Sequence, residues 1–282
     1  MSRTWYLAVI SLFALTAFVS GEKVWLPAAA HAKTTAGPNI VNVVAREYQY
    51  EMPDSIPAGP TLFHFTDDGK QLHHMTIVKF EQGKTLADFT ALPPGPLPGW
   101  VVFMGGPNTP MPNGGQDEDI VDLSPGNYAV ICVIPDSDGK PHMMKGMVKA
   151  LTVTPSTQAR TMPAGDLTLT LTNYAFTFST PLTAGRHAIR VVNNGTQPHE
   201  AVMFRLNAGK TGEDIANWVS TGMQGPPPGD PVAGISAEAP GKDNTLLLDL
   251  SPGSYALLCF VPDAKDGKMH AMHGMIYNFK VG

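Results

Sequence analysis

An internal repeat constrains this chain more than any other feature. When the sequence is aligned with itself at an offset of 126 to 128 residues, one motif after another recurs. Asp122–Ala129, followed by Cys132, returns as Asp249–Ala256, followed by Cys259. A repeat of this length indicates two copies of one domain, and a chain of 282 residues has room for two domains that each bury a core.

The limits of the repeat predict the domain organisation. We expect an export segment over residues 1–32, a first domain over 38–155 and a second domain over 165–282, with the linker between them near 155–165. The 28 glycines and 26 prolines show no collagen-like period and favour a turn-rich β fold.

Short β-branched and aromatic runs, separated by turns such as Ser-Pro-Gly, predict an all-β chain of two tandem Greek-key β-sandwich domains. The expected strands of the first copy are 41–50, 61–65, 74–80, 128–133 and 147–153. Those of the second copy are 167–176, 185–192, 200–206, 255–261 and 275–281. One helical pattern interrupts each copy, at 85–92 and at 212–219.

The N-terminus has the pattern of an export signal. Arg3 precedes an apolar run, Trp5 to Val19, which is short for a membrane span. The protein is therefore expected to be exported, to a periplasmic or extracellular location. An uncleaved segment acting as an N-terminal membrane tether is the alternative.

Charge excludes one class of partner. The net charge of −5 comes without a basic stripe, so no nucleic-acid partner is expected. No Ser-His-Asp arrangement and no carboxylate pair suggests a hydrolase, and no catalytic residue is predicted. The acidic residues 117–119 are expected in a solvated turn, because the second copy does not repeat them.

The two cysteines, Cys132 and Cys259, occupy the same place in successive copies. In an exported chain, a pair of cysteines normally predicts a disulfide. Here a disulfide would need the two domains to face each other at equivalent internal positions. A local role for each cysteine explains the repetition more simply.

The repeated polar positions supply that role. A site that accepts both Cu(I) and Cu(II) needs two imidazoles, one thiolate and a weak axial thioether. Each copy holds this set at matching positions, which predicts one copper ion per domain. The candidate metal ligands are His73, Cys132, His142 and Met147 in the first copy, and His199, Cys259, His270 and Met275 in the second.

Some polar residues next to these candidate ligands differ between the two copies. His74 aligns with Glu200, so neither is expected to be a required ligand. His273, three residues after His270, is an alternative ligand in the second copy, where the first copy has Lys145.

These motifs resemble those of the cupredoxins, the plastocyanin and pseudoazurin type of copper protein. The run Asn193–His199 resembles their Asn-rich turn and Pro-His, and Leu250–Tyr255 resembles the strand before their copper cysteine. His142–Met147 and His270–Met275 resemble their closing His, three residues, Gly-Met. The resemblance implies two cupredoxin-like domains with type 1 copper sites.

One departure from that pattern is an insert between the cysteine and the second histidine. Nine residues (133–141) separate the two in the first copy and ten (260–269) in the second, against a few in plastocyanin-like proteins. We expect the insert to loop out and return as an added turn.

Three functions follow from the copper interpretation. The first is an electron carrier that works with a redox partner protein. The second is a periplasmic copper storage, delivery or resistance protein that works with copper-handling partners. The third is a multicopper enzyme such as a nitrite reductase, for which the expected additional copper ligands are missing: Ile131 and Leu258, and not histidines, precede the cysteines.

Overall fold

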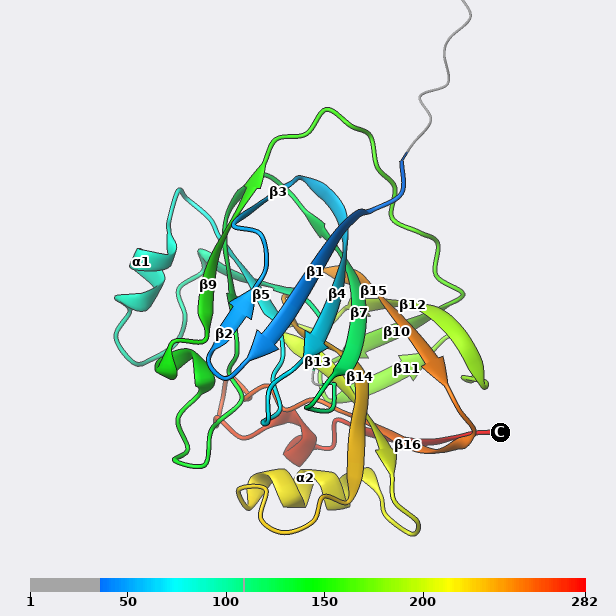
Figure 1. Cartoon of the computed structure of the whole chain (residues 1–282). Coiled ribbons are helices and arrows are strands. Elements are labelled where there is room, and N and C mark those ends of the chain that lie inside the picture. The colour runs from blue at the N-terminus through cyan, green and yellow to red at the C-terminus, as the bar shows by residue number, and fades with distance from the viewer. Residues whose placement is uncertain (1–35, 109) are drawn as a thin grey trace, which may run out of the picture. The chain divides into compact units, whose positions relative to one another are not determined.

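The computed structural model describes residues 36–108 and 110–282 (Figure 1). Their strands form two sheets, one of eight strands and one of nine, which confirms the predicted all-β fold class. The predicted export segment, residues 1–32, lies outside the described residues. None of the described helices is long and apolar enough to cross a membrane.

The first sheet has the strand order β11-β10-β12-β15-β7-β4-β1-β2. Its strands are β1 (Asn39–Arg46), β2 (Gln49–Glu51), β4 (Gly59–Asp67), β7 (Gly115–Leu123), β10 (Leu167–Thr172), β11 (Ala175–Phe178), β12 (Gly185–Asn193) and β15 (Asp243–Leu250).

The second sheet has the strand order β17-β16-β13-β14-β6-β5-β8-β9-β3. Its strands are β3 (Ser55–Pro57), β5 (Thr76–Phe80), β6 (Val101–Gly105), β8 (Gly126–Ile131), β9 (Val148–Thr154), β13 (His199–Leu206), β14 (Gly229–Glu238), β16 (Gly253–Leu258) and β17 (Ile276–Val281).

Each half of the chain has a core of its own between the two sheets. One apolar cluster draws its residues from 41–153 and another from 167–281, and each contains one of the two cysteines. In β1 the buried positions alternate with exposed or half-buried ones, as expected for a strand with one face on a core. The duplication and its exact domain limits stay predictions from the sequence. In each sheet, however, the equivalent strands of the two halves follow one another in mirror order about the middle, as in β11-β10-β12-β15 and β7-β4-β1-β2.

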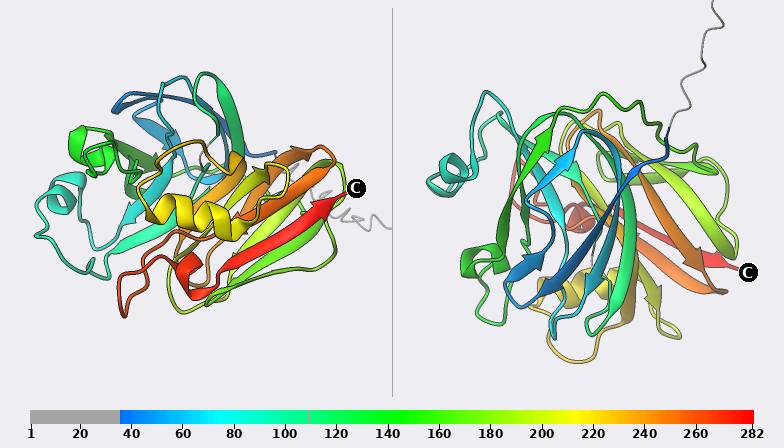
Figure 2. Two further views of the ribbon diagram at one scale, coloured as in Figure 1. Left: turned by 90° about the horizontal axis from the view of Figure 1, so that it is seen from below. Right: turned by 45° about the horizontal axis from the view of Figure 1, so that its top comes forward.

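The two sheets continue from one half into the other, as the ribbon views show (Figures 1 and 2). β7 pairs antiparallel with β15, and β6 pairs antiparallel with β14. Because each joining strand meets its own counterpart, the two halves are related approximately as the subunits of a two-fold dimer are.

These joining strands correct one prediction. Residues 117–119 are not in a solvated turn: they lie in β7, where Asp117 and Asp119 are 4% and 0% exposed. The local sequence is acidic, but the Asp117 carboxylate is buried where the halves meet and accepts hydrogen bonds from the backbone N–H groups of Asn108 and Gly234. Burial raises the pKa of Asp117 to about 7 and the pKa of Asp119 well above its ordinary value.

The expected strands at 41–50 and 167–176 are each hairpins. β1 reverses into β2 at Tyr48, and β10 reverses into β11 at Tyr174. Both tyrosines have a positive φ, 62° and 66°, which is unusual for a bulky residue. Sequence signals for a turn were therefore weak at both places.

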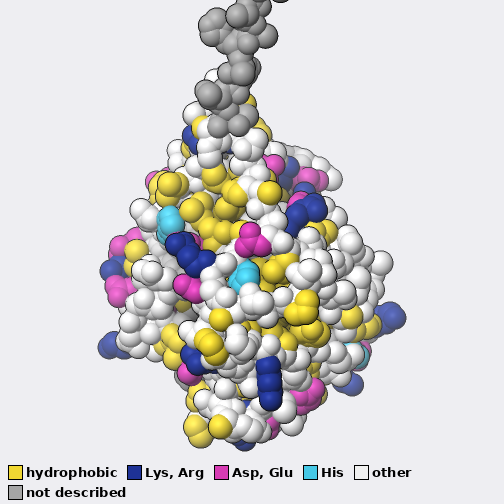
Figure 3. All heavy atoms as spheres, turned by 90° about the vertical axis from the view of Figure 1, so that its right-hand side faces the viewer, with side chains coloured by type: hydrophobic (Ala, Val, Ile, Leu, Met, Phe, Trp, Pro, Cys, Tyr) yellow, Lys and Arg dark blue, Asp and Glu magenta, His cyan; other side chains and the backbone are white. Residues whose placement is uncertain are grey.

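The two predicted helices are present as α1 (Leu86–Thr90) and α2 (Gly212–Ser220). Each begins with a capping box, in which Thr85 pairs with Asp88 and Thr211 with Asp214. On the face of the molecule in Figure 3, basic side chains are scattered among apolar and acidic ones and form no continuous stripe.

Candidate metal centres

In each half, two histidines and the cysteine converge on one point. In the first half, the Nδ1 atoms of His73 and His142 are 3.1 Å apart, and Cys132 Sγ is 3.5 Å from His142 Nδ1. The candidate ligand atoms of these three residues all lie within 4.8 Å of one another.

The second half repeats this geometry. The Nδ1 atoms of His199 and His270 are 3.0 Å apart, and Cys259 Sγ lies 3.3 Å from His270 Nδ1 and 3.9 Å from His199 Nδ1. Both cysteines are free and buried, so the two sulfurs are not bonded to each other.

These separations fit a metal ion. Ligand bonds of about 2.0–2.3 Å in a tetrahedral site put the ligand atoms about 3.3–3.6 Å apart. The spacings of 3.0–3.9 Å in the two halves bracket that range. Two imidazole nitrogens and a thiolate are also the donors that Cu(I), Cu(II) and Zn²⁺ favour.

The first histidine of each site is fixed by the turn before it. Asp67 accepts hydrogen bonds from the backbone N–H groups of Gly69, at 3.0 Å, and His73, at 2.9 Å. A Cβ on Gly69 would lie 2.6 Å from the His73 ring, so only glycine fits there. In the second half, Asn193 accepts from Gly195 at 2.9 Å, and a Cβ on Gly195 would lie 2.5 Å from the equivalent ring.

Backbone hydrogen bonds hold the other three candidate ligands together. In the first half, Cys132 N–H donates to Met147 O at 3.2 Å, and Met147 N–H donates to His142 O at 3.1 Å. Met143 N–H donates back to Cys132 O at 2.8 Å. The second half has the same three bonds, with lengths of 3.4, 3.0 and 2.8 Å.

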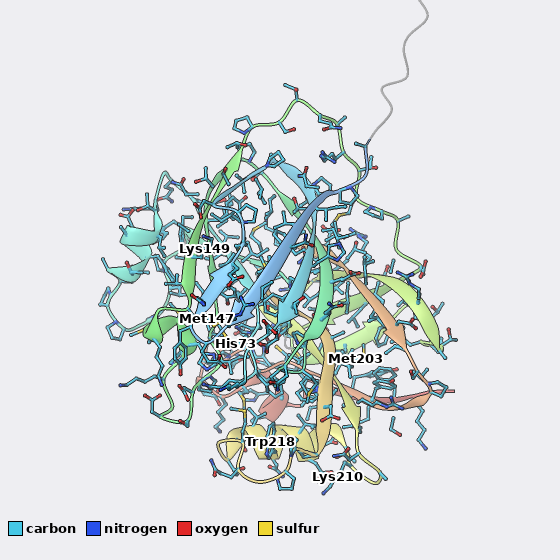
Figure 4. The ribbon with its side chains drawn as sticks, in the orientation of Figure 1. His73, Met147, Lys149, Met203, Lys210 and Trp218 are labelled. Atoms are coloured by element: carbon cyan, nitrogen blue, oxygen red, sulfur yellow. The ribbon has the colours of Figure 1, made fainter. Side chains whose placement is uncertain are left out.

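The second histidine begins a short 3₁₀ turn, and the methionine follows the turn. The turn spans His142–Lys145 in the first half and His270–His273 in the second, and a left-handed glycine ends each one. Figure 4 labels His73 and Met147, which lie near each other in that view. The insert before each turn loops out and returns, as predicted: Pro135 bridges to Pro141, and Pro262 to Met269.

All eight predicted ligands are 0% exposed. Burial lowers the pKa of His73 and of His199 to about 4 and also lowers those of His142 and His270. Burial raises the pKa of the Cys132 thiol to about 12 and that of Cys259 further still. Without a metal, each site therefore holds a neutral thiol and neutral imidazoles at pH 7.

Sequence reasoning missed a tyrosine that covers the second histidine in each half. The ring of Tyr48 meets His142 edge to face, with ring centroids 5.4 Å apart, and its hydroxyl donates to Asp136 in the insert. Tyr174 repeats this at 5.6 Å from His270 and donates to Asp263. The unusual positive φ of both tyrosines places their rings there, and the repeat of a tyrosine at both turns was the available signal.

Sequence reasoning also missed a hydrogen-bonded joint between the halves. Val133 N–H donates to His74 Nε2 at 2.9 Å, and Phe260 N–H donates to Glu200 Oε1 at 2.8 Å. The aligned residues His74 and Glu200 thus hold the residue after each cysteine.

Asn108 connects these two side chains. Its Oδ1 lies 3.3 Å from His74 Nδ1, and its Nδ2 donates to Glu200 Oε2 at 3.2 Å. Because His74 Nε2 already accepts a hydrogen bond, Nδ1 is the protonated nitrogen and donates to Asn108. His74 and Glu200 therefore have a structural role in this arrangement, since their side chains bind the backbone N–H groups of Val133 and Phe260.

Comparisons with known proteins give only weak similarity. No protein-family model matches the chain, and no curated protein sequence does. Among solved structures, reduced auracyanin from Roseiflexus castenholzii is 22% identical, with a TM-score of 0.30, over 43% of this chain and 100% of its own.

Two larger copper proteins match over more of the chain. A multicopper oxidase is 14% identical, with a TM-score of 0.27, over 86% of this chain and 88% of its own. Copper nitrite reductase from Nitrosomonas europaea is 14% identical, with a TM-score of 0.26, over 88% and 94%. TM-scores of this size do not establish a shared fold, so the chain's own geometry has to support any functional conclusion.

Proposed function

We propose that the chain is a cupredoxin-like copper protein that binds one copper ion in each half and carries electrons. The observation that supports this most strongly is the duplicated donor set. In both halves, two imidazole nitrogens and one sulfur lie within 4.8 Å of one another. The sequence places a methionine at the same position beside each set, and all eight side chains are buried.

Copper bound to such donors would supply one-electron chemistry, because the set suits both oxidation states. The protein's part is to hold the donors still. The backbone bonds among Cys132, His142 and Met147, and the turn that fixes His73, leave little freedom for rearrangement. A rigid site of this kind favours electron transfer, which needs no substrate to reach the metal.

An enzymatic role has less support. A catalytic metal site normally keeps one position open for water or substrate. Here the candidate ligands are fully covered, with Tyr48 over one site and Tyr174 over the other.

One observation favours copper storage or delivery as the second candidate. Met144 and Met272 are equivalent residues in the two 3₁₀ turns, and their side chains are 71% and 48% exposed. Exposed thioethers beside each site are soft groups that could pass Cu(I) to or from a partner.

The partner and the location belong to the same proposal. A redox partner or copper-handling protein would approach the site of the first half beside Met144 and Val133, which are both exposed next to candidate ligands. Export to the periplasm or the cell exterior follows from the N-terminal pattern alone, as does the alternative of a membrane tether.

The test is to add Cu(II) to the purified full chain and record visible absorption and electron paramagnetic resonance. An electron carrier is expected to give an intense charge-transfer band and a narrow copper hyperfine splitting from both halves. Cys132→Ser and Cys259→Ser should each remove half of the absorption. A protein that binds copper without colour would favour storage or delivery, and a protein that binds none would contradict the proposal.

A further inference from the structure

The insert after each cysteine contains a pair of aspartates, and the side chain that contacts this pair differs between the two halves. In the first half, Lys145 Nζ lies 2.5 Å from Asp136 Oδ2 and 3.2 Å from Asp138 Oδ1. The same ammonium group lies 5.5 Å from the centre of the Tyr48 ring. The first half thus keeps a cation of its own between two carboxylates and beside an aromatic ring.

The second half keeps the carboxylates but not that cation. Asp263 and Asp266 replace Asp136 and Asp138, and His273 takes the place of Lys145. Oxygens of the two carboxylates and a ring nitrogen of His273 all lie within 4.8 Å of one another.

The His273 ring holds the same position as the lysine. Its Nε2 is 3.1 Å from Asp266 Oδ1, and its ring centroid is 5.3 Å from that of Tyr174. In the first half, the side chain beside the two aspartates is the permanently charged Lys145. In the second half it is His273, whose ring nitrogen is able to bind a cation.

An independent observation comes from the buried side of this cluster. His270 is 0% exposed, and its Nε2 has no hydrogen-bond partner among the described residues. That nitrogen lies 3.6 Å from Asp263 Oδ2, which is too long for a hydrogen bond. His142 Nε2 in the first half is also unpartnered, but of the two described nitrogens only His270 Nε2 has a carboxylate within 4.0 Å, and this approach points to a water or an ion between the two groups.

We propose that the second half binds a divalent transition-metal ion such as Zn²⁺ through Asp263, Asp266 and His273. This outer site is separate from the His199–Cys259–His270 site. Carboxylate oxygen and imidazole nitrogen are ordinary zinc donors, and three protein ligands leave a position for a water molecule. The first half cannot bind the ion, because the Lys145 ammonium occupies the corresponding space.

The outer ion would be linked to the inner site through its ligands. Asp263 Oδ2 accepts hydrogen bonds from the Tyr174 hydroxyl and from Gln197 Nε2, at 2.9 Å for the latter. Tyr174 in turn covers His270. The ion would therefore bind, through the buried Asp263, to the layer of side chains that seals the inner site, while its other two ligands, Asp266 and His273, are exposed.

Exchange of Lys145 and His273 between the two halves gives a matched test. The full chain, free of metal, is titrated with Zn²⁺ by calorimetry as the native sequence and as His273→Lys, Lys145→His and Asp266→Asn. His273→Lys copies the arrangement that the first half already holds, so it is expected to fold.

Beyond the zinc that the two thiol sites take up, the native chain is expected to show one further zinc step that His273→Lys abolishes and Asp266→Asn weakens about 10- to 100-fold. Lys145→His should add a second step of the same kind. Survival of the step with unchanged affinity in both His273→Lys and Asp266→Asn would overturn the proposal.

A second measurement separates the outer site from the inner ones. The double variant Cys132→Ser, Cys259→Ser should keep the outer step, and X-ray absorption of its zinc should show only nitrogen and oxygen ligands. Loss of the step in this double variant would assign the zinc to the thiol sites and refute an outer site. Because the thiol sites are disabled there, this result does not depend on the proposed electron-carrier function.

Discussion

Filling the His73–Cys132–His142 site with Cu(I) is expected to release about one proton at pH 8 and fewer than two at pH 6. The thiol, with its pKa raised to about 12, is fully protonated in the metal-free protein and must lose its proton to bind. His73, with a pKa of about 4, is only about 1% protonated at pH 6, so it has no proton to release. Burial also lowers the pKa of His142, so it releases fewer protons at pH 6 than an ordinary histidine would.

Ordinary histidines would behave differently. With a pKa near 6.5, each would be about three-quarters protonated at pH 6, and two of them would add about 1.5 protons to the thiol proton. At pH 8 both cases converge on about one proton. The difference in proton release between pH 6 and pH 8 therefore shows whether burial keeps the imidazoles neutral.

The assay is an anaerobic pH-stat titration of the metal-free chain with Cu(I) held by a weak competing ligand, at pH 6 and at pH 8. We expect about two protons per chain at pH 8, one from each half, and fewer than four at pH 6. Cys132→Ser should lower the count by one and serves as the control. An increase of one or more protons per site between pH 8 and pH 6 would refute the burial of neutral imidazoles.

Three further changes test the surroundings of the sites. Gly195→Ala brings a Cβ to 2.5 Å from the His199 ring and should weaken metal binding in the second half about 10- to 100-fold in a competition titration, whereas Gly99→Ala, with open space around it, should not. Asn108→Ala should lower the free energy of unfolding in urea by about 2–4 kcal/mol, because it leaves buried groups of His74 and Glu200 unpaired; unchanged stability would show that the joint is dispensable. Burial raises the pKa of Asp67 from 3.8 to about 7, so its contribution to stability is present below pH 4 and is lost as the pH rises through 7. Asp67→Asn, which copies Asn193, should therefore gain stability over the native chain between pH 5 and pH 8, by at most about 4 kcal/mol, and a constant difference across that range would contradict the assigned pKa.

The repeat made the centre of each site predictable from sequence. A histidine, a cysteine, a second histidine and a methionine recur in order, so one spatial arrangement had to serve both copies. The structure brings the two histidines and the cysteine of each copy together as that reasoning required. The inserts also return to the site, closed by the bridge between Pro135 and Pro141 and its counterpart.

The joint between the halves was not predictable in the same way. Asp117 lies in an acidic run that reads as a solvated turn, but it is buried where the halves meet, with its carboxylate bound to the N–H groups of Asn108 and Gly234. No local sequence pattern marks Asn108, because the side chains that it connects come from the distant positions 74 and 200. Such contacts depend on how the halves meet, which periodicity within one strand does not encode.

The covering tyrosines were missed for a local reason. Tyr48 and Tyr174 occupy left-handed positions that glycine or asparagine usually fills, so each hairpin looked like one long strand. Their repetition becomes informative only once the neighbouring histidine is known to need a cover.

Copper X-ray absorption combined with metal analysis of the loaded full chain tests the central claim most directly. The geometry predicts two copper ions per chain, each bonded to one thiolate sulfur and two imidazole nitrogens, and none with a sulfur ligand of that kind in the double variant Cys132→Ser, Cys259→Ser. Copper bound through nitrogen and oxygen alone, or a stoichiometry that the two cysteine changes leave intact, would contradict it.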